Sequence, residues 1–260
     1  MIGNIWETLI IMPMLNSLLW IYSSLGNFAI AIILFTILVR LITHPLTVRQ
    51  LKGAQAMQEM QKSKKWQDLQ KKYKNDKQKL QQEQMKLYQE MGVNPLSSCL
   101  PTLIQFPIII GLYQAIIRAL AVTPLQMTGL FYYIYPFSNV SSALPIDSRF
   151  LWMDLSLPER LFIPGINFGF PILAVLVLVT TYFQSRLISP PAQPGEQGAQ
   201  MTQMMNLYMP LFMGYLAYSF AAGLALYFIT SNLVTILQYA LMGRANWSNL
   251  LPSLGLKREG

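Results

Sequence analysis

The sequence predicts an all-α polytopic membrane protein: a bundle of five transmembrane helices with a cytoplasmic helical hairpin and an N-terminal interfacial amphipathic helix. Composition is the first reason, because 53% of the 260 residues are hydrophobic and only 12% are charged, which is unusual for a soluble domain. The second reason is that four uncharged stretches each exceed the ~20 residues that a helix needs to cross a bilayer. These stretches are 8–39, 91–117, 161–185 and 197–243. They lack the alternation of apolar and polar residues that barrel strands show.

The N-terminus predicts a helix that lies on the membrane rather than across it. One helical face is apolar and the other polar. The apolar face holds Ile2, Ile5, Trp6, Leu9 and Met12, and the polar face holds Asn4, Glu7 and Thr8. The basic region and cleavage site of a signal peptide are absent. We therefore expect an amphipathic helix before Pro13, within an interfacial region of residues 1–22, and not a sixth crossing.

The first span is predicted at 23–46, and it is followed by the one strongly polar segment, 47–96. Asn75 or Asp76 offers a helix N-cap and Gly92 a C-terminal stop, so two helices are expected to reverse near residues 73–75. This cytoplasmic hairpin is interpreted as an arm for substrate capture or for contact with a ribosome or lipid. A solvated, charge-laced loop is the alternative. The lysines assigned to capture are Lys62, Lys64, Lys65, Lys71, Lys72 and Lys74.

The remaining elements follow from the other uncharged stretches. Their predicted ranges are span 2 at 97–119, an extracytoplasmic loop at 120–166, span 3 at 167–187, a cytoplasmic loop at 188–203, spans 4 and 5 at 204–221 and 222–243, and a cytoplasmic tail at 244–260. The loop after span 2 is rich in aromatic residues, which favour the water–lipid boundary. The last stretch is too long for one crossing, and Gly223 offers a bend near its middle.

The distribution of Lys and Arg predicts the orientation. Five crossings place the hairpin lysines, Arg186 and Arg244 on one side, and Arg118, Arg149 and Arg160 on the other. By the positive-inside rule the N-terminus is outside and the C-terminus is in the cytoplasm. The expected location is the bacterial cytoplasmic (plasma) membrane.

Arg40 is the one charge well inside a predicted span, because Arg118 and Arg186 lie at the ends of spans 2 and 3. An arginine at the bilayer centre costs roughly 2.5–3.5 kcal/mol on insertion scales, and no span offers an acid to pair with it. Water and uncharged polar groups are then its expected hosts, in a wet concavity of the inner leaflet. The candidate groove residues are Thr36, Gln105, Gln184, Phe228, Asn232, Thr235 and Gln238. Snorkelling of the Arg40 side chain to the headgroups is the alternative.

The sequence contains no motif that predicts a catalytic site. Cys99 is the only cysteine and His44 the only histidine, so we predict no metal site and no disulfide. The serines in the spans have no base placed by a motif, and no glycine-rich phosphate loop is present. We expect a protein that is not an enzyme, needs no cofactor and binds no DNA.

Four motifs, in this order along the chain, closely resemble the YidC/Oxa/Alb family of membrane protein insertases. They are "ILFTILVRLITHPLTVRQ", "YKNDKQKLQQEQMKLYQEMGVNPLSSCLPTLIQFPIIIGLYQAI", "FLWMDLS" and "GLALYFITSNLVTILQ". The resemblance implies a five-span core around a hydrophilic groove that is open to cytosol and lipid and closed on the outer side. The family arginine matches Arg40, and groove roles carry over to Thr36, Gln105 and Tyr227. Phe228 stands where many members have Tyr or Trp.

The resemblance also implies what the protein does and with which partners. The clients would be nascent membrane proteins, released into the lipid bilayer, and the ribosome and the Sec translocon are further candidate partners. We expect a short bacterial form, without the large periplasmic domain of Gram-negative members. A small transporter or channel, and a passive assembly chaperone, are the alternative functions.

Overall fold

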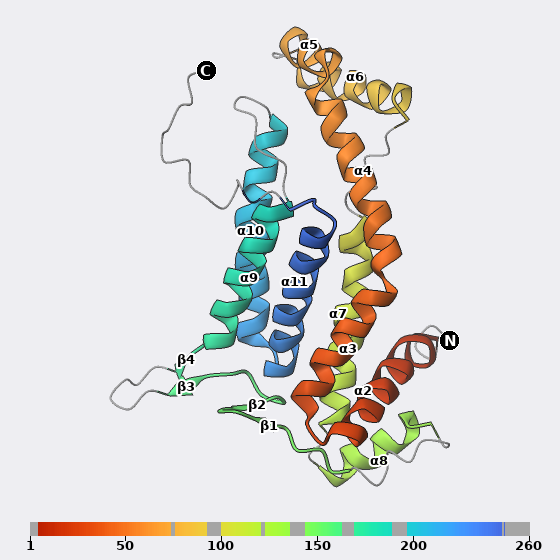
Figure 1. Ribbon diagram of the computed structural model, residues 1–260, viewed down its shortest axis with the longest axis vertical. Coiled ribbons are helices and arrows are strands. Elements are labelled where there is room, and N and C mark those ends of the chain that lie inside the picture. Colours follow the sequence, from red (N-terminus) through yellow and green to blue (C-terminus); the bar gives the residue numbers. More distant parts are fainter. Residues whose placement is uncertain are drawn as a thin grey trace.

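The computed structural model describes residues 5–73, 76–92, 100–120, 123–135, 144–162, 169–188, 197–245 and 247. Helices dominate these residues and form an elongated bundle, with α5 and α6 at one end and α8 and the strands at the other (Figure 1). The prediction of a helical bundle is confirmed. The term all-α is too simple, however, because two pairs of two-residue antiparallel strands occur. These are β1 (Arg149–Phe150) with β2 (Met153–Asp154), and β3 (Leu161–Phe162) with β4 (Gly169–Phe170).

The N-terminal helix runs past Pro13 instead of ending before it. A π-helical turn, η1 (Glu7–Ile11), leads directly into α2 (Met12–Leu25), and Pro13 lies in the first turn of α2. Proline has no N–H for the carbonyl four residues earlier, and its ring crowds that carbonyl. A wider π turn just before the proline relieves both problems, so the helix continues. It ends at Gly26, whose φ of 67° is left-handed.

The helix packs on the bundle mainly through its later turns and leaves part of the predicted apolar face exposed. Ile5 and Leu9 are exposed, and the buried residues are Ile11, Leu15, Leu18 and Leu19. Glu7 is only partly exposed, because its Oε1 accepts a hydrogen bond from the Tyr133 hydroxyl at 2.9 Å and lies 3.5 Å from Nη2 of Arg118. The Glu7 side chain therefore ties the N-terminal helix to α7 (Leu100–Ala119) and α8 (Pro124–Tyr133). An interfacial position in the membrane stays a prediction.

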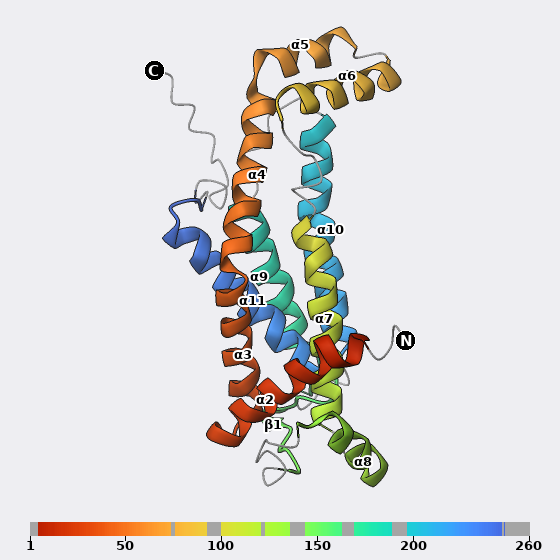
Figure 2. The ribbon, with the colours of Figure 1, turned by 90° about the vertical axis from the view of Figure 1, so that its right-hand side faces the viewer.

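The helix of the first predicted span continues into the polar segment. Asn27 caps α3 (Phe28–Ile42) by accepting from the Ile30 N–H at 3.1 Å. Thr43 separates α3 from α4 (His44–Lys62) and keeps nearly helical dihedral angles, with φ −83° and ψ −2°. The two helices run in one direction as a single long rod (Figure 2). Arg40 therefore sits on the same rod that carries the hairpin.

The predicted hairpin is built from three helices, not two. Ser63 adopts an extended conformation after α4 and caps α5 (Lys64–Lys72) by accepting from the Trp66 N–H at 3.3 Å. After the reversal, Asp76 caps α6 (Lys77–Glu90), as the sequence predicts, by accepting from the Lys79 N–H at 3.1 Å. The break at Ser63 is absent from the prediction. It turns α5 away from the axis of α4.

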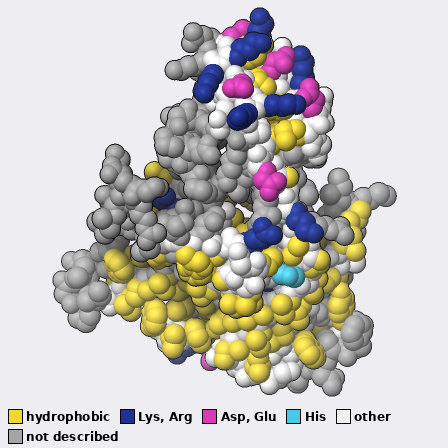
Figure 3. Space-filling model, turned by 45° about the horizontal axis from the view of Figure 1, so that its top comes forward, with side chains coloured by type: hydrophobic (Ala, Val, Ile, Leu, Met, Phe, Trp, Pro, Cys, Tyr) yellow, Lys and Arg dark blue, Asp and Glu magenta, His cyan; other side chains and the backbone are white. Residues whose placement is uncertain are grey.

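The hairpin has a small hydrophobic core of its own. Met60, Trp66 and Leu87 are buried together, and the rings of Trp66 and Tyr88 lie 5.7 Å apart. Burial raises the pKa of the Tyr88 hydroxyl above its usual value. Charged side chains cover the outside of this part, while hydrophobic side chains cover most of the bundle in the same view (Figure 3).

The bundle is organised around α11 (Ala222–Leu241), which packs against α3, α7, α9 (Ile172–Ile188) and α10 (Gln197–Ser219). The turn between α10 and α11 lies at residues 220–221, where predicted spans 4 and 5 meet, but Gly223 itself is in the first turn of α11 and does not form the bend. Gly223 instead lies where a Cβ atom would be 3.1 Å from Cγ2 of Ile116 and 3.3 Å from the Leu155 carbonyl oxygen. This position has no side chain because three segments converge on it.

Two predicted loops contain more regular structure than expected. Residues 197–203, part of the predicted loop 188–203, belong to α10, and residues 189–196 lie outside the described parts. Within the predicted loop 120–166, α8 begins with a capping box in which Thr123 and Gln126 bond each other's backbone N–H groups. From the sequence we predict a surface loop here and not this capping box.

A helix covers most of each of the five predicted spans, although α10 begins seven residues before span 4. Among the described residues, two helical stretches are long and apolar enough to cross a membrane, Glu7–Leu25 and Ala222–Leu241. Two shorter apolar helices are Phe28–Ile42 and Ile172–Ile188. The number of crossings therefore remains a prediction.

Candidate functional site

Arg40 turns its guanidinium towards α11. Its Nε donates to Ser231 Oγ at 3.0 Å, and its Nη2 donates to the same oxygen. Ser231 is 3% exposed, so Arg40 bonds a buried partner inside the bundle. In this arrangement the Arg40 side chain bonds a neighbouring helix, whereas a snorkelling arginine would extend along its own helix towards the headgroups. Ser231 is absent from the predicted groove residues.

A chain of hydroxyl and amide groups continues from Ser231 to α7. The Ser231 and Tyr227 hydroxyls share a hydrogen bond, and Gln105 Nε2 donates to Tyr227 Oη at 2.5 Å. Because Ser231 Oγ accepts from Arg40, its single hydrogen is free to be donated to Tyr227. The chain therefore links α3, α11 and α7 through groups that carry no charge of their own.

Gln238 contacts Arg40 through the backbone. Its Nε2 donates to the Arg40 carbonyl oxygen at 3.2 Å, in the last turn of α3, where carbonyl groups lack partners within the helix. The other end of the same amide, Oε1, is buried and has no hydrogen-bond partner among the described residues. A buried acceptor without a partner is costly, so this atom is a natural contact for water or for a donor on a bound chain.

Three other predicted residues are buried near this chain. Thr36 donates to the Ile32 carbonyl at 2.6 Å and Thr235 to the Ser231 carbonyl at 2.7 Å, so both hydroxyls are satisfied within their own helices. Phe228 is 5% exposed and its ring lies 5.6 Å from that of Tyr227. Their role as groove residues stays a proposal, since none of these groups points a free polar atom at Arg40.

The polar residues predicted to share one face of α11 contact two different helices, α9 and α3. Asn232 Nδ2 donates to Thr180 Oγ1 at 3.1 Å and to Thr181 Oγ1 at 2.8 Å, so Asn232 faces α9 instead of Arg40. Gln184 lies one turn further along α9, partly exposed, with no hydrogen bond to another described residue. The face that meets α3 holds Tyr227, Ser231 and Gln238 instead. Their spacing of four and seven residues is the sequence signal that could have identified Ser231.

Arg40 has no acidic partner in the described parts of the chain. The ion pairs there are Lys86 with Glu83, at 2.6 Å, and Arg118 with Glu7. The described residues also contain no group of His, Cys, Asp and Glu that could hold a metal ion. Ser231, Tyr227 and Gln238 are buried and Arg40 is partly exposed, so these side chains form a polar cluster at Arg40. We call these residues, with Gln105, the Arg40 cluster. The wet concavity around Arg40 stays a prediction.

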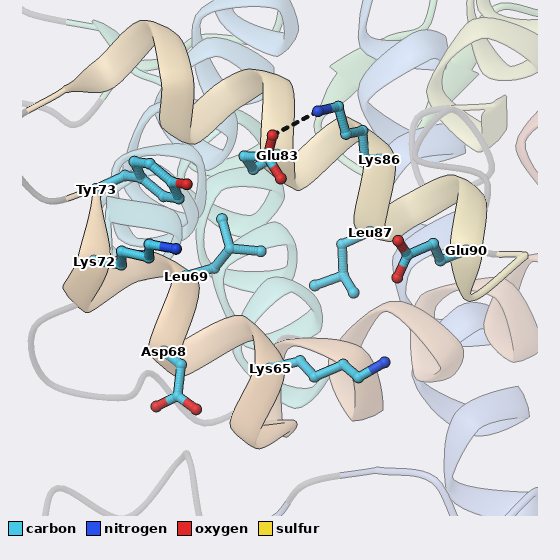
Figure 4. Close-up of a pocket in the computed structure, with 9 residues that line it drawn as sticks. All are labelled: Lys65, Asp68, Leu69, Lys72, Tyr73, Glu83, Lys86, Leu87 and Glu90. Atoms are coloured by element: carbon cyan, nitrogen blue, oxygen red, sulfur yellow. Dashed lines mark hydrogen bonds and ion pairs between the residues drawn. The ribbon is translucent and has the colours of Figure 1, made fainter.

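The hairpin carries a separate pocket between α5 and α6 (Figure 4). Basic and acidic side chains alternate around its apolar floor. The lining residues are Lys65, Asp68, Leu69, Lys72, Tyr73, Glu83, Lys86, Leu87 and Glu90. A hydrogen bond from Lys86 to Glu83 raises the pKa of the Lys86 ammonium.

The predicted capture lysines divide between this pocket and the surface. Lys65 and Lys72 line the pocket, and Lys64 and Lys71 are exposed on α5. The side chain of Lys62 and all of Lys74 lie outside the described residues. A role of these lysines in substrate capture stays a proposal.

Comparison with known proteins finds a matching family model and several similar proteins. The family model described as 60Kd inner membrane protein matches residues 20–248. The chain is 34% identical over 253 residues to the membrane protein insertase YidC of Oceanobacillus iheyensis, covering 93% of this chain and 84% of that protein. It is also 34% identical over 240 residues to the membrane protein insertase MisCA of Bacillus subtilis, covering 90% and 78%.

A solved structure agrees with the sequence comparisons. The crystal structure of an active YidC insertase, with its first transmembrane domain resolved, gives a TM-score of 0.53 at 28% identity. The match covers 86% of this chain and 43% of that chain, so the present sequence spans under half the length of the solved protein. All residues of the Arg40 cluster lie within the part of the chain that the family model matches.

Proposed function

Because the chain belongs to the YidC/Oxa/Alb family of membrane protein insertases, we propose that it is itself a membrane protein insertase and chaperone. It takes nascent membrane proteins into a hydrophilic, positively charged groove that is open to cytosol and lipid. It then releases their spans laterally into the bilayer. The reaction breaks no covalent bond and uses no cofactor, so the protein is not an enzyme.

The single observation that carries this proposal is the environment of Arg40. A cation lies within an apolar bundle, and its hydrogen-bond partner is the uncharged Ser231. An ion pair would neutralise the charge, whereas a serine hydroxyl leaves it available to an incoming anion. At an effective dielectric constant near 20, a carboxylate ~4 Å from Arg40 would gain about 4 kcal/mol. An acidic tail on a client is therefore the ligand that the cluster suits best.

Opening of the groove requires the Arg40 cluster to loosen on the hairpin side. Two features support this step. Arg40 is itself partly exposed, and Oε1 of Gln238 has no partner among the described residues. Water or backbone N–H groups of a client would satisfy this oxygen when the cluster opens. Polar groups along the path then reduce the desolvation cost of the client backbone.

Lateral release is proposed to occur between α7 and α10. Both helices pack on α11, but α7 otherwise packs mainly on the N-terminal helix and α10 on α9. Each also exposes large apolar side chains, such as Phe106 on α7 and Phe212 on α10. Near the end opposite the hairpin, the rings of Tyr113 and Phe220 lie 4.9 Å apart. A client segment leaving along this seam gains about 0.8 kcal/mol for each methylene that it moves from water into lipid.

The hairpin is proposed to receive clients and to bring their source close. It has its own core and a lysine-rich outside, so it can move as a unit on the α3–α4 rod. Anionic lipid headgroups, the ribosome and the Sec translocon are candidate partners for this surface. The same charge asymmetry supports a plasma membrane orientation with the N-terminus outside and the C-terminus in the cytoplasm.

Reconstitution of the purified protein into liposomes tests the proposal. We expect insertion of a single-span client with an acidic translocated tail, a large loss for Arg40→Ala and substantial activity for Arg40→Lys, which keeps the charge. Arg186→Ala, which removes a cation from the end of α9, is the matched control and should resemble wild type. Protease protection of the client tail measures insertion.

Three results would contradict parts of this proposal. Equal insertion by Arg40→Ala and wild type would reject the charge mechanism. Flux of small solutes without insertion of the client would favour a transporter or channel. Folding help that appears only when a translocon is added would favour an assembly chaperone.

A further inference from the structure

Glu159 is a buried carboxylate that the proposed mechanism does not use. It is 6% exposed, and both of its oxygens are paired. Oε1 accepts from the indole N–H of Trp152 at 3.0 Å, and Oε2 accepts from the backbone N–H of Leu173 at 3.1 Å. Leu173 lies in the first turn of α9, where N–H groups lack partners in the helix and the helix dipole favours a negative charge.

The segment just before Glu159 is bonded to a second helix. The Leu157 carbonyl accepts from the Ala222 N–H at 2.8 Å, and the Leu155 carbonyl accepts from the Gly223 N–H at 3.1 Å. These two donors belong to the first turn of α11. We call residues 152–159 the strap. Glu159 bonds it to the first turn of α9, and the carbonyls of Leu155 and Leu157 bond it to the first turn of α11. In Figure 1 the strands of this region lie across the end of the bundle opposite the hairpin.

The bundle beneath the strap is tightly packed. Leu155 is fully buried, and Met153 is 6% exposed. A Cβ atom on Gly223 would lie 3.1 Å from Cγ2 of Ile116 and 3.3 Å from Cδ1 of Ile32, which is closer than side chains normally approach. Segments from α3, α7 and α11 therefore pack closely together under the strap. The polar Arg40 cluster lies on the other side of this packed layer, towards the hairpin.

We propose that Glu159 is a positioning residue that latches the strap over the extracytoplasmic ends of α9 and α11, and that this latch seals the bundle against ions. The inference rests on the proposed insertase function, because a groove open to cytosol and lipid becomes a pore if its outer end loosens. Glu159 acts through the strap and touches no client. Its hydrogen bond from the Leu173 N–H fixes the strap to α9, its hydrogen bond from Trp152 braces the strap internally, and the strap carbonyls bond α11.

Ion leak through proteoliposomes tests the latch. Vesicles carry an internal pH-sensitive dye, a pH gradient is imposed, and its decay is compared among variants. Glu159→Gln keeps the shape but removes the charge and places an NH2 group against one of two donors. Losing a charge-assisted hydrogen bond changes an open–closed equilibrium by about tenfold, so we expect the protein-dependent leak to rise by about that factor. Trp152→Phe removes one donor and leaves the bond to α9, so a smaller rise is expected.

A matched control and a second readout separate sealing from general damage. Asp147→Asn changes an exposed carboxylate that accepts from the Arg149 N–H in the same loop, and it should leak like wild type. The unfolding temperature is measured for every variant. A latch role predicts increased leak at an unfolding temperature near that of wild type, which a purely structural role does not.

The following results would overturn the proposed latch or the proposed insertase function. Wild-type leak in Glu159→Gln overturns the latch, and so does an equal rise in Asp147→Asn. If Glu159→Gln does not fold, Trp152→Phe decides, and wild-type leak in that variant overturns the proposal. Client insertion is assayed in the same vesicles. A wild-type protein that inserts nothing would reject the insertase function, while the leak comparison would still stand.

Discussion

The two ends of the bundle treat their polar groups in opposite ways. At the strap, the Glu159 carboxylate has both oxygens paired and backbone N–H groups of α11 have carbonyl partners. In the Arg40 cluster, one serine oxygen serves two donors of a charged group, and Oε1 of Gln238 has no partner among the described residues. Full pairing produces a rigid end, and incomplete pairing leaves an end that can exchange its contacts for those of another chain. We therefore expect the Arg40 end of the bundle to open to a client while the strap end stays closed.

The largest expected effect comes from overfilling the strap end. Gly223→Val places a branched side chain where Ile116, Ile32 and the Leu155 carbonyl leave no space, and overpacking of this kind costs about 3 kcal/mol. We expect a clear fall in the unfolding temperature measured in detergent. Gly129→Val is the matched control, because no heavy atom lies within 4 Å of a Cβ built at Gly129. Equal unfolding temperatures for the two variants would show that the strap end is not packed as described.

An intermediate effect is expected in the Arg40 cluster. Ser231→Ala removes the oxygen that accepts from Arg40, and hydrogen bonds to charged groups contribute enough to change an equilibrium by about tenfold. We expect a loss of client insertion of that order in the liposome assay, with little change in unfolding temperature.

Thr230→Val is the control for Ser231→Ala. The Thr230 hydroxyl bonds the Leu226 carbonyl of its own helix at 2.9 Å, so its removal should leave insertion near the wild-type rate. If Thr230→Val were as impaired as Ser231→Ala, the loss would reflect α11 in general and not the host of Arg40.

The smallest effect is expected where α9 meets α11. Asn232→Leu removes the hydrogen bonds to Thr180 and Thr181, and such bonds between membrane helices contribute about 0.6 kcal/mol. We expect a small decrease in the free energy of unfolding, and a loss of insertion smaller than that of Ser231→Ala. A loss as large as that of Ser231→Ala would place Asn232 in the path of the client and remove the distinction drawn here between the two faces of α11.

The sequence was sufficient for features that depend on composition and on local signals. Uncharged stretches located the bundle helices. Of the two candidate caps, Asn75 and Asp76, the structure has Asp76, and this signal is local because it needs only three following residues. Arg40 could be singled out because a charge in a span is rare whatever surrounds it. These inferences need no knowledge of which helices are neighbours.

Features that depend on tertiary neighbours were missed. Asn232 and Ser231 are adjacent in sequence and point to different helices, so choosing between them requires the relative rotation of α3, α9 and α11. Gly223 was interpreted as a flexible bend because its absence of a side chain has two opposite explanations, freedom and crowding. Pro13 predicts the end of a helix, and the π turn that lets the helix continue past it leaves no strong mark in the sequence.

The sequence separation of Arg40 and Ser231 also determines when their hydrogen bond can form during translation. The two residues are 191 positions apart, so at about 5–20 residues per second a ribosome needs roughly 10 to 40 seconds to supply the serine after the arginine. During that interval the newly synthesised α3 has no α11 beside it, so Arg40 lacks its Ser231 partner. The hydrogen bond between them can form only when translation is nearly complete.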